Sequence, residues 1–141
     1  MAVRLNPYLG FENSAREAME FYQSVMGGEL TISTFGEAKA EVQPDELDLV
    51  MHAMLTTENG IVLMASDAPA HIEHETGSSI SVSLSGEAED DEVLSGYFDG
   101  LSAGGKVTVP LAAAPWGDKF GMFKDKFGTN WMVNIAGAKS E

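Results

Sequence analysis

The chain has 141 residues, enough for one domain or for two small modules that share a core. Hydrophobic residues make up 44% and charged residues 21% of it, which are ordinary values for a globular protein. Its 8 basic and 22 acidic residues give a formal net charge of −14, and a surface of that sign repels nucleic acids and anionic membranes. The absence of cysteine excludes disulfides, zinc–thiolate sites and thiol catalysis.

No apolar run approaches the roughly 20 residues that a membrane-spanning helix needs. The segment Met1–Pro7 also lacks the apolar core of a signal peptide. We therefore expect a cytoplasmic protein whose partners include neither nucleic acid nor a membrane.

The first secondary-structure signals are a strand followed by a helix. Residues 5–11 read as a strand, and Ser14 with Glu17 three positions later forms a capping-box pattern that predicts a helix start. Gly27 and Gly28 are expected to end this helix. The apolar positions that follow helical spacing between these limits are Ala18, Met19, Tyr22, Val25 and Met26.

Three further strands are predicted in the first half, over residues 29–34, 49–57 and 61–66. The last two are separated by Glu58-Asn59-Gly60, and Asn-Gly between apolar runs is a strong hairpin signal because both residues tolerate positive φ. The order of elements in this half is therefore β-α-β-β-β.

The second half repeats that order. Residues 79–85 alternate serine with apolar residues, with Ile80, Val82 and Leu84 on the side expected to face a helix. Acidic residues 89–92 open a helix with the apolar stripe Val93, Leu94, Tyr97, Phe98 and Leu101. Gly96 and Gly100 lie inside it, so either they permit close helix–sheet packing or the helix is short. Strands are expected over residues 106–110, about 118–124 and 130–136.

The two halves can be aligned with each other. Phe21, Gly27, Gly28, Leu30 and Ile32 match Phe98, Gly104, Gly105, Val107 and Val109 at an offset of 77, and Gly60, Leu63 and Met64 match Gly128, Trp131 and Met132 at an offset of 68. A duplicated unit is predicted. The fold class is α+β, one domain over residues 1–141 built from a module of about 3–69 and a second of about 78–137.

Two clusters of charged or imidazole groups deserve weighing as cation sites. Glu41, Asp45 and Asp48 lack calcium-loop spacing, so we interpret them as solvated surface charge. His71-Ile72-Glu73-His74-Glu75 falls in the connection between halves, where it is either an exposed linker or an adventitious metal site.

Short motifs in a fixed order link the chain to a known family. They are Pro7-Tyr8-Leu9-Gly10-Phe11, Glu17-Ala18, Phe21-Tyr22, His52-Ala53, Met64-Ala65-Ser66-Asp67, Pro115-Trp116, Phe120-Gly121, Asp125-Lys126-Phe127-Gly128 and Trp131-Met132-Val133-Asn134. The chain resembles the vicinal oxygen chelate (glyoxalase/bleomycin resistance/dioxygenase) superfamily. Within it, the likeness is to the PhnB-like branch, whose members often carry a 3-demethylubiquinone 3-methyltransferase-like label. No glycine-rich cofactor loop follows a strand in support of that label.

The resemblance implies two modules that form a curved mixed sheet around a cleft, and a homodimer. Family enzymes bind a divalent metal through His and Glu, and the matching positions in this chain are Pro7, Met64, Ser81 and Met132. Proline, thioethers and serine are poor ligands for zinc or iron. We therefore predict that the metal site is lost and that no cofactor is bound.

The cleft is expected to hold a small, mostly apolar molecule, because methionine, aromatic and small polar residues would line it. The candidate lining residues are Tyr8, His52, Met64, Ser81, Ser83, Trp116, Phe120, Met132 and Asn134. Trp131, on the opposite strand parity, is assigned to the core, and Asp125-Lys126-Phe127-Gly128 to a structural turn.

Three functions remain open at this point. The first is a metal-free protein that binds a small apolar molecule. The second is an enzyme of the lyase, isomerase or dioxygenase type that uses His52, Ser66 or Asp67. His52, on the face of Val50 and Met54, fits a satisfied core or cavity histidine better than a catalytic base. The third is a non-catalytic dimeric scaffold.

Overall fold

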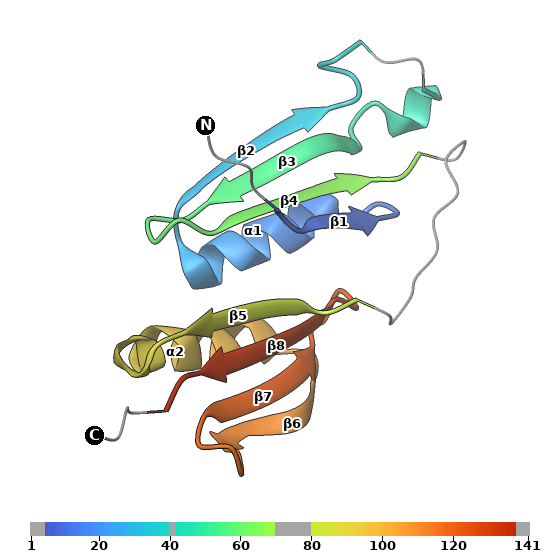
Figure 1. Cartoon of the computed structure of the whole chain (residues 1–141). Helices are drawn as coiled ribbons and strands as arrows, with labels where there is room; N and C mark the ends of the chain where they lie inside the picture. The colour runs from blue at the N-terminus through green and yellow to red at the C-terminus, as the bar shows by residue number, and fades with distance from the viewer. Residues whose placement is uncertain (1–4, 40–41, 70–79, 138–141) are drawn as a thin grey trace. The chain divides into compact units, whose positions relative to one another are not determined.

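A computed structural model describes residues 5–39, 42–69 and 80–137 of the chain. Within them lie two four-stranded mixed sheets, each with one 12-residue α-helix (Figure 1). The chain divides into two compact units, Met1–Thr76 and Gly77–Glu141. The predicted α+β class and the two βαβββ modules are confirmed, with four strands paired into a mixed sheet in each module.

Unit 1 contains the predicted β-α-β-β-β order. Its elements are β1 (Tyr8–Phe11), α1 (Ala15–Met26), β2 (Glu29–Thr34), β3 (Val50–Thr56) and β4 (Val62–Asp67). The sheet order is β1-β4-β3-β2, with β1 parallel to β4 and the other pairs antiparallel. A short 3-10 helix, Pro44–Glu46, lies between β2 and β3 along the chain.

Unit 2 repeats this topology. Its elements are β5 (Val82–Gly86), a 3-10 turn (Ala88–Asp90), α2 (Asp91–Ser102), β6 (Lys106–Ala113), β7 (Lys119–Lys124) and β8 (Asn130–Ile135). The sheet order β5-β8-β7-β6 and its single parallel pair, β5 with β8, match unit 1 strand for strand. The duplication predicted from the offsets is therefore present in the topology.

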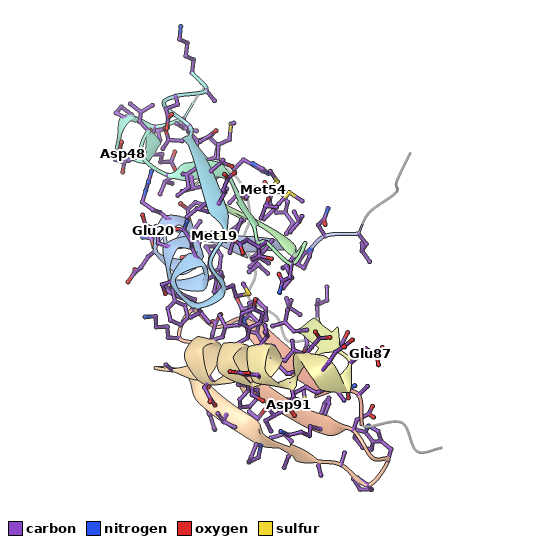
Figure 2. All side chains as sticks on the ribbon, turned by 90° about the vertical axis from the view of Figure 1, so that its left-hand side faces the viewer. Met19, Glu20, Asp48, Met54, Glu87 and Asp91 are labelled. Carbon is purple, nitrogen blue, oxygen red and sulfur yellow. The ribbon has the colours of Figure 1, made fainter. Side chains whose placement is uncertain are left out.

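Each helix covers one side of its own sheet. On α1, Met19 is fully buried while Glu20 is exposed, and Figure 2 shows Glu20 on the outer side of the helix. On α2, Leu94, Phe98 and Leu101 are buried, whereas Val93 is exposed. We call the sheet side that packs on the helix the covered face and the other side the open face. Ile80, expected on the covered face, is 80% exposed and lies before β5 begins.

The group that caps the start of α1 differs from the prediction. Ser14 makes no side-chain capping bond, so the predicted capping box is wrong. Instead Asp67, at the end of β4, accepts one hydrogen bond from the Ala15 N–H and one from the Val50 N–H, each at 2.9 Å. Asp67 is only 4% exposed, so a buried carboxylate joins the helix start to β3.

Both modules also repeat one close backbone approach. A Cβ placed on Gly28 would lie 2.7 Å from Thr57 Cα, and one on Gly105 would lie 2.8 Å from Asp125 Cα. Real Cβ atoms do not approach backbone so closely, so the turn between helix and second strand requires glycine in each unit.

The helix α2 continues through Gly96 and Gly100, so these glycines do not shorten it. A Cβ at Gly96 would meet nothing within 4 Å, so its presence is not explained by close packing. Gly96→Ala should raise the free energy of unfolding by about 0.5–1 kcal/mol, because alanine loses less backbone entropy in a helix. Urea unfolding followed by circular dichroism measures the change.

Gly121→Ala is the matched control for that substitution. A Cβ at Gly121 would lie 2.7 Å from the Phe98 ring, so the same chemical change should destabilise the protein. A loss of stability in Gly96→Ala would contradict the assignment of Gly96 to an unobstructed helix surface.

Candidate functional site

The open face of unit 1 brings together side chains from three adjacent strands. Tyr8 pairs with Met64 across β1 and β4, and Met54 pairs with Met64 across β3 and β4. His52 Nε2 lies 3.4 Å from Met64 Sδ, and the His52 and Tyr8 ring centroids are 5.7 Å apart at 49°. The sequence-predicted residues Tyr8, His52 and Met64 thus form one cluster. Met54, which the sequence placed on the face of His52 but not among the lining residues, is their neighbour.

A shift in strand register explains why Val50 does not share this face with His52. The β2–β3 register changes between Ser33 and Thr34, so that His52 pairs with Ser33 while Val50 pairs with Thr34. Val50 is 1% exposed and His52 is half-buried. The expectation that Val50 shares the face of His52 is wrong, because the irregularity changes the alternation between these two residues.

The two other acid–base candidates lie on opposite sides of β4. Ser66 is half-buried and pairs with Gly10 on the open face. Asp67 lies on the covered face, and both of its carboxylate oxygens accept backbone N–H bonds. A structural role therefore accounts for Asp67, and His52 and Ser66 are the candidates that the open face retains.

The strand register gives the neighbours of the residues that the sequence matched to the family's metal positions. The partner of Met64 is Tyr8, whereas Pro7 precedes β1 and its carbonyl accepts the Met64 N–H at 3.1 Å. The partner of Met132 is Ser83, two residues beyond the expected Ser81. Thioether, phenol and hydroxyl groups form a poor donor set for a divalent metal.

The described residues contain no group of three or more His, Asp or Glu side chains placed to hold a metal ion. His71, His74 and Glu41, which the sequence raised as possible cation ligands, lie outside the described residues. Asp45 and Asp48 are exposed.

The open face of unit 2 carries a second group of predicted residues. Asn134 on β8 stands between Ser85 on β5 and Phe120 on β7 in the strand register. The Phe120 and Trp116 rings are 5.8 Å apart and meet edge to face at 61°. Trp116 is 63% exposed, so core packing does not account for it.

Asp118 connects these groups and was not identified from the sequence. Its carboxylate accepts hydrogen bonds from the Gly137 N–H at 2.9 Å and from Asn134 Nδ2 at 3.2 Å. These two bonds, the one from Gly137 first, lower the pKa of Asp118 below its ordinary value of 3.8. The available signal was its position two residues after Trp116, but the distant Asn134 and Gly137 could not be paired with it from spacing.

Two sequence assignments to structural roles are confirmed. Trp131 is 1% exposed and stacks on Phe123, and its Nε1–H donates to Asp125 Oδ2 at 2.9 Å. Asp125 also accepts the N–H groups of Phe127 and Thr129, which holds the turn before β8. These residues build the unit 2 core and leave the open face to Trp116, Phe120 and Asn134.

Two solved structures and one further bacterial protein are similar to this chain over nearly its whole length. A solved structure of PA1353 from Pseudomonas aeruginosa is 34% identical, with a TM-score of 0.83 and coverage of 97% of this chain and 100% of that one. The PhnB protein from Bacillus cereus is 29% identical, with a TM-score of 0.71 and coverage of 95% and 100%. Protein YjdN of Escherichia coli K12 is 27% identical over 93% of this chain and 94% of its own length.

Within the described residues, no helix has the length and apolar character needed to cross a membrane. The sequence model of the Glyoxalase/Bleomycin resistance protein/Dioxygenase superfamily matches residues 4–133, which is nearly the whole chain. The two βαβββ units, the strand register and this match agree: the chain belongs to the Glyoxalase/Bleomycin resistance protein/Dioxygenase superfamily.

Proposed function

We propose that this protein binds a small, mostly apolar organic molecule on the open faces of its sheets without the help of a metal ion. One observation carries the proposal, namely the chemistry of the side chains at the paired positions on the first and last strand of each unit. Tyr8 faces Met64 in unit 1, and Ser83 faces Met132 in unit 2. None of these groups is a carboxylate or an imidazole.

Thioethers and aromatic rings suit an apolar ligand for a physical reason. A methionine side chain has three rotatable bonds and a polarisable sulfur, so it adapts to irregular shapes and makes favourable contacts with rings. Ser83, Ser85 and Asn134 add a few hydrogen-bonding groups on the unit 2 open face. Such a mixture, mostly apolar with few polar groups, is typical of small-molecule sites.

An enzymatic role for His52 is the second candidate. His52 is half-buried on the open face and contacts Met64 and Tyr8, so it could exchange protons with a bound molecule. A general base is usually oriented by a carboxylate or a carbonyl, but the contact described for the His52 ring nitrogen is a thioether. We therefore favour binding over catalysis. Ser66 is the other polar side chain on this face that an enzymatic role could use.

We further propose that the protein acts as a homodimer. Several large apolar side chains of the described residues are exposed in the single chain, including Val93, Val107 and Val109. Light scattering should then give about twice the chain mass of 15.0 kDa.

The proposed function is tested by thermal unfolding of the purified protein against a panel of hydrophobic metabolites and antibiotics. A ligand at 100 times its Kd stabilises a protein by about 2.7 kcal/mol, which shifts the Tm by several degrees. Met64→Ala should reduce the shift that a binding compound causes. Glu20→Ala, at an exposed position on the outer side of α1, should leave that shift unchanged.

Elemental analysis of the same preparation, before and after treatment with a chelator, checks the metal-free part of the proposal. We expect no stoichiometric transition metal and no change in Tm on chelation. One tightly held metal per chain would contradict it. A Tm that no compound in the panel moves would favour the scaffold function instead.

A further inference from the structure

The amide of Asn134 has a fixed orientation on the unit 2 open face. A carboxylate only accepts hydrogen bonds when ionised, so Asp118 Oδ2 must be met by the NH₂ end of the Asn134 amide. The bonds that lower the Asp118 pKa keep this carboxylate ionised at neutral pH. The Asn134 oxygen, Oδ1, is consequently left over as a hydrogen-bond acceptor.

No side-chain bond within the described part of the chain occupies that oxygen. Asn134 is half-buried and directly opposite Phe120 in the β7–β8 register. A ligand that lies over Phe120 is therefore close to Asn134 Oδ1, which can only accept a hydrogen bond. The Asn134 NH₂ group does not turn toward the ligand, because it is bonded to Asp118.

Trp116 supplies a second aromatic surface at the same place. Its ring meets Phe120 edge to face at 61°, with the ring centroids 5.8 Å apart. The turn that carries it passes through Gly117 at φ 101° and closes with the Gly117 N–H bonded to the Ala114 carbonyl. The Asp118 carboxylate thus orients the Asn134 amide beside this pair of aromatic rings.

We propose that Asp118 is a positioning residue, and that Trp116, Phe120 and Asn134 form a subsite for a flat aromatic ligand that carries an N–H or O–H donor. This inference deepens the proposed function and rests on it. The donor meets Asn134 Oδ1 while the ring lies against the aromatic side chains. An otherwise equal ligand without the donor leaves that oxygen without its water or its partner, which costs affinity.

Indole and 1-methylindole are suitable probes because they differ by one methyl group on the nitrogen donor. Both are titrated into ¹⁵N-labelled protein, and the Kd values are taken from the shifts of the Trp116 side-chain N–H and the Gly137 amide. We expect indole to bind about fivefold more tightly, which corresponds to one net hydrogen bond of about 1 kcal/mol.

Three variants separate positioning from folding. Asn134→Ala should bring the ratio of the two Kd values close to one while 1-methylindole still binds. Asp118→Asn, which can donate as well as accept, should lower the ratio because the Asn134 amide is then free to turn over. Asp91→Asn removes a hydrogen-bonded carboxylate from α2, where it pairs with Lys119 at 3.0 Å, and should leave the ratio unchanged.

The outcomes distinguish this inference from the broader proposal. A ratio that persists in Asn134→Ala would mean that the methyl group is excluded by its size, which overturns the role of Asn134. Equal binding of both probes to the unchanged protein would overturn the donor preference and leave the apolar binding function standing. Binding of neither probe would overturn the aromatic subsite, and the compound panel would still decide the proposed function.

Discussion

Replacing Asp67 with alanine should lower the free energy of unfolding by about 2–5 kcal/mol, because each buried N–H left without an acceptor costs about 1–3 kcal/mol. The two donors concerned are the Ala15 N–H at the start of α1 and the Val50 N–H at the start of β3. Water cannot readily replace the carboxylate, since Asp67 is 4% exposed and both Ala15 and Val50 are buried. Urea unfolding followed by circular dichroism gives the change in stability.

Asp48→Ala is the matched control, because it removes an exposed carboxylate from the same unit and should change stability by less than about 0.5 kcal/mol. Asp67→Asn retains one acceptor oxygen and should fall between the two. If Asp67→Ala unfolded at the same urea concentration as Asp48→Ala, the joining role of Asp67 would be wrong. A loss of ligand binding in Asp67→Ala without loss of stability would instead return Asp67 to the candidate site.

Asp67 also shows where prediction from sequence reaches its limit. The Ser14–Glu17 pattern predicted the start of α1 correctly, because the position of a helix boundary depends on residues that are close together in the sequence. The group that bonds that boundary lies 52 residues further along the chain. Local pattern cannot reveal such a partner, because only the folded β-sheet brings the end of β4 beside the helix start.

The strands illustrate the same division between local and distant information. Alternation correctly separated Met64 from Leu63 and Ser83 from Leu84, since side chains on a strand point to opposite faces in turn. It failed at Val50, where the register with β2 shifts. A bulge depends on the partner strand, so the sequence of β3 alone does not indicate it.

The candidate site was predictable in its residue types and less so in its pairing. Carrying family positions over by spacing placed the metal positions at Pro7 and Ser81, but strand register puts Tyr8 and Ser83 opposite the two methionines. Spacing along a chain counts residues, whereas a site is set by which residues pair across strands. Asp118 was missed for the same reason.

The second large effect is expected at Gly28, where the chain leaves α1 and enters β2. Gly28 has φ of +94°, and a Cβ on it would lie 2.7 Å from Thr57 Cα. Gly28→Ala therefore combines left-handed strain, about 1–2 kcal/mol, with a backbone clash that costs about 1–3 kcal/mol or more. We expect the free energy of unfolding to fall by a total of about 2–5 kcal/mol, measured by urea unfolding.

Two other glycines, Gly27 beside Gly28 and its counterpart Gly105 in unit 2, allow the strain and the clash to be measured separately. Gly27 has φ of +73° and ψ of −165°, a conformation that glycine alone adopts readily, and nothing lies within 4 Å of its Cβ position, so Gly27→Ala should show backbone strain without a clash. Gly105, the unit 2 counterpart of Gly28, has no positive φ but would place its Cβ 2.8 Å from Asp125 Cα, so Gly105→Ala should show the clash alone. If Gly28→Ala reduced the free energy of unfolding no more than Gly27→Ala does, that result would mean that the turn can move away from Thr57. The close backbone approach at Gly28 and Gly105 would then not explain why each unit has glycine there.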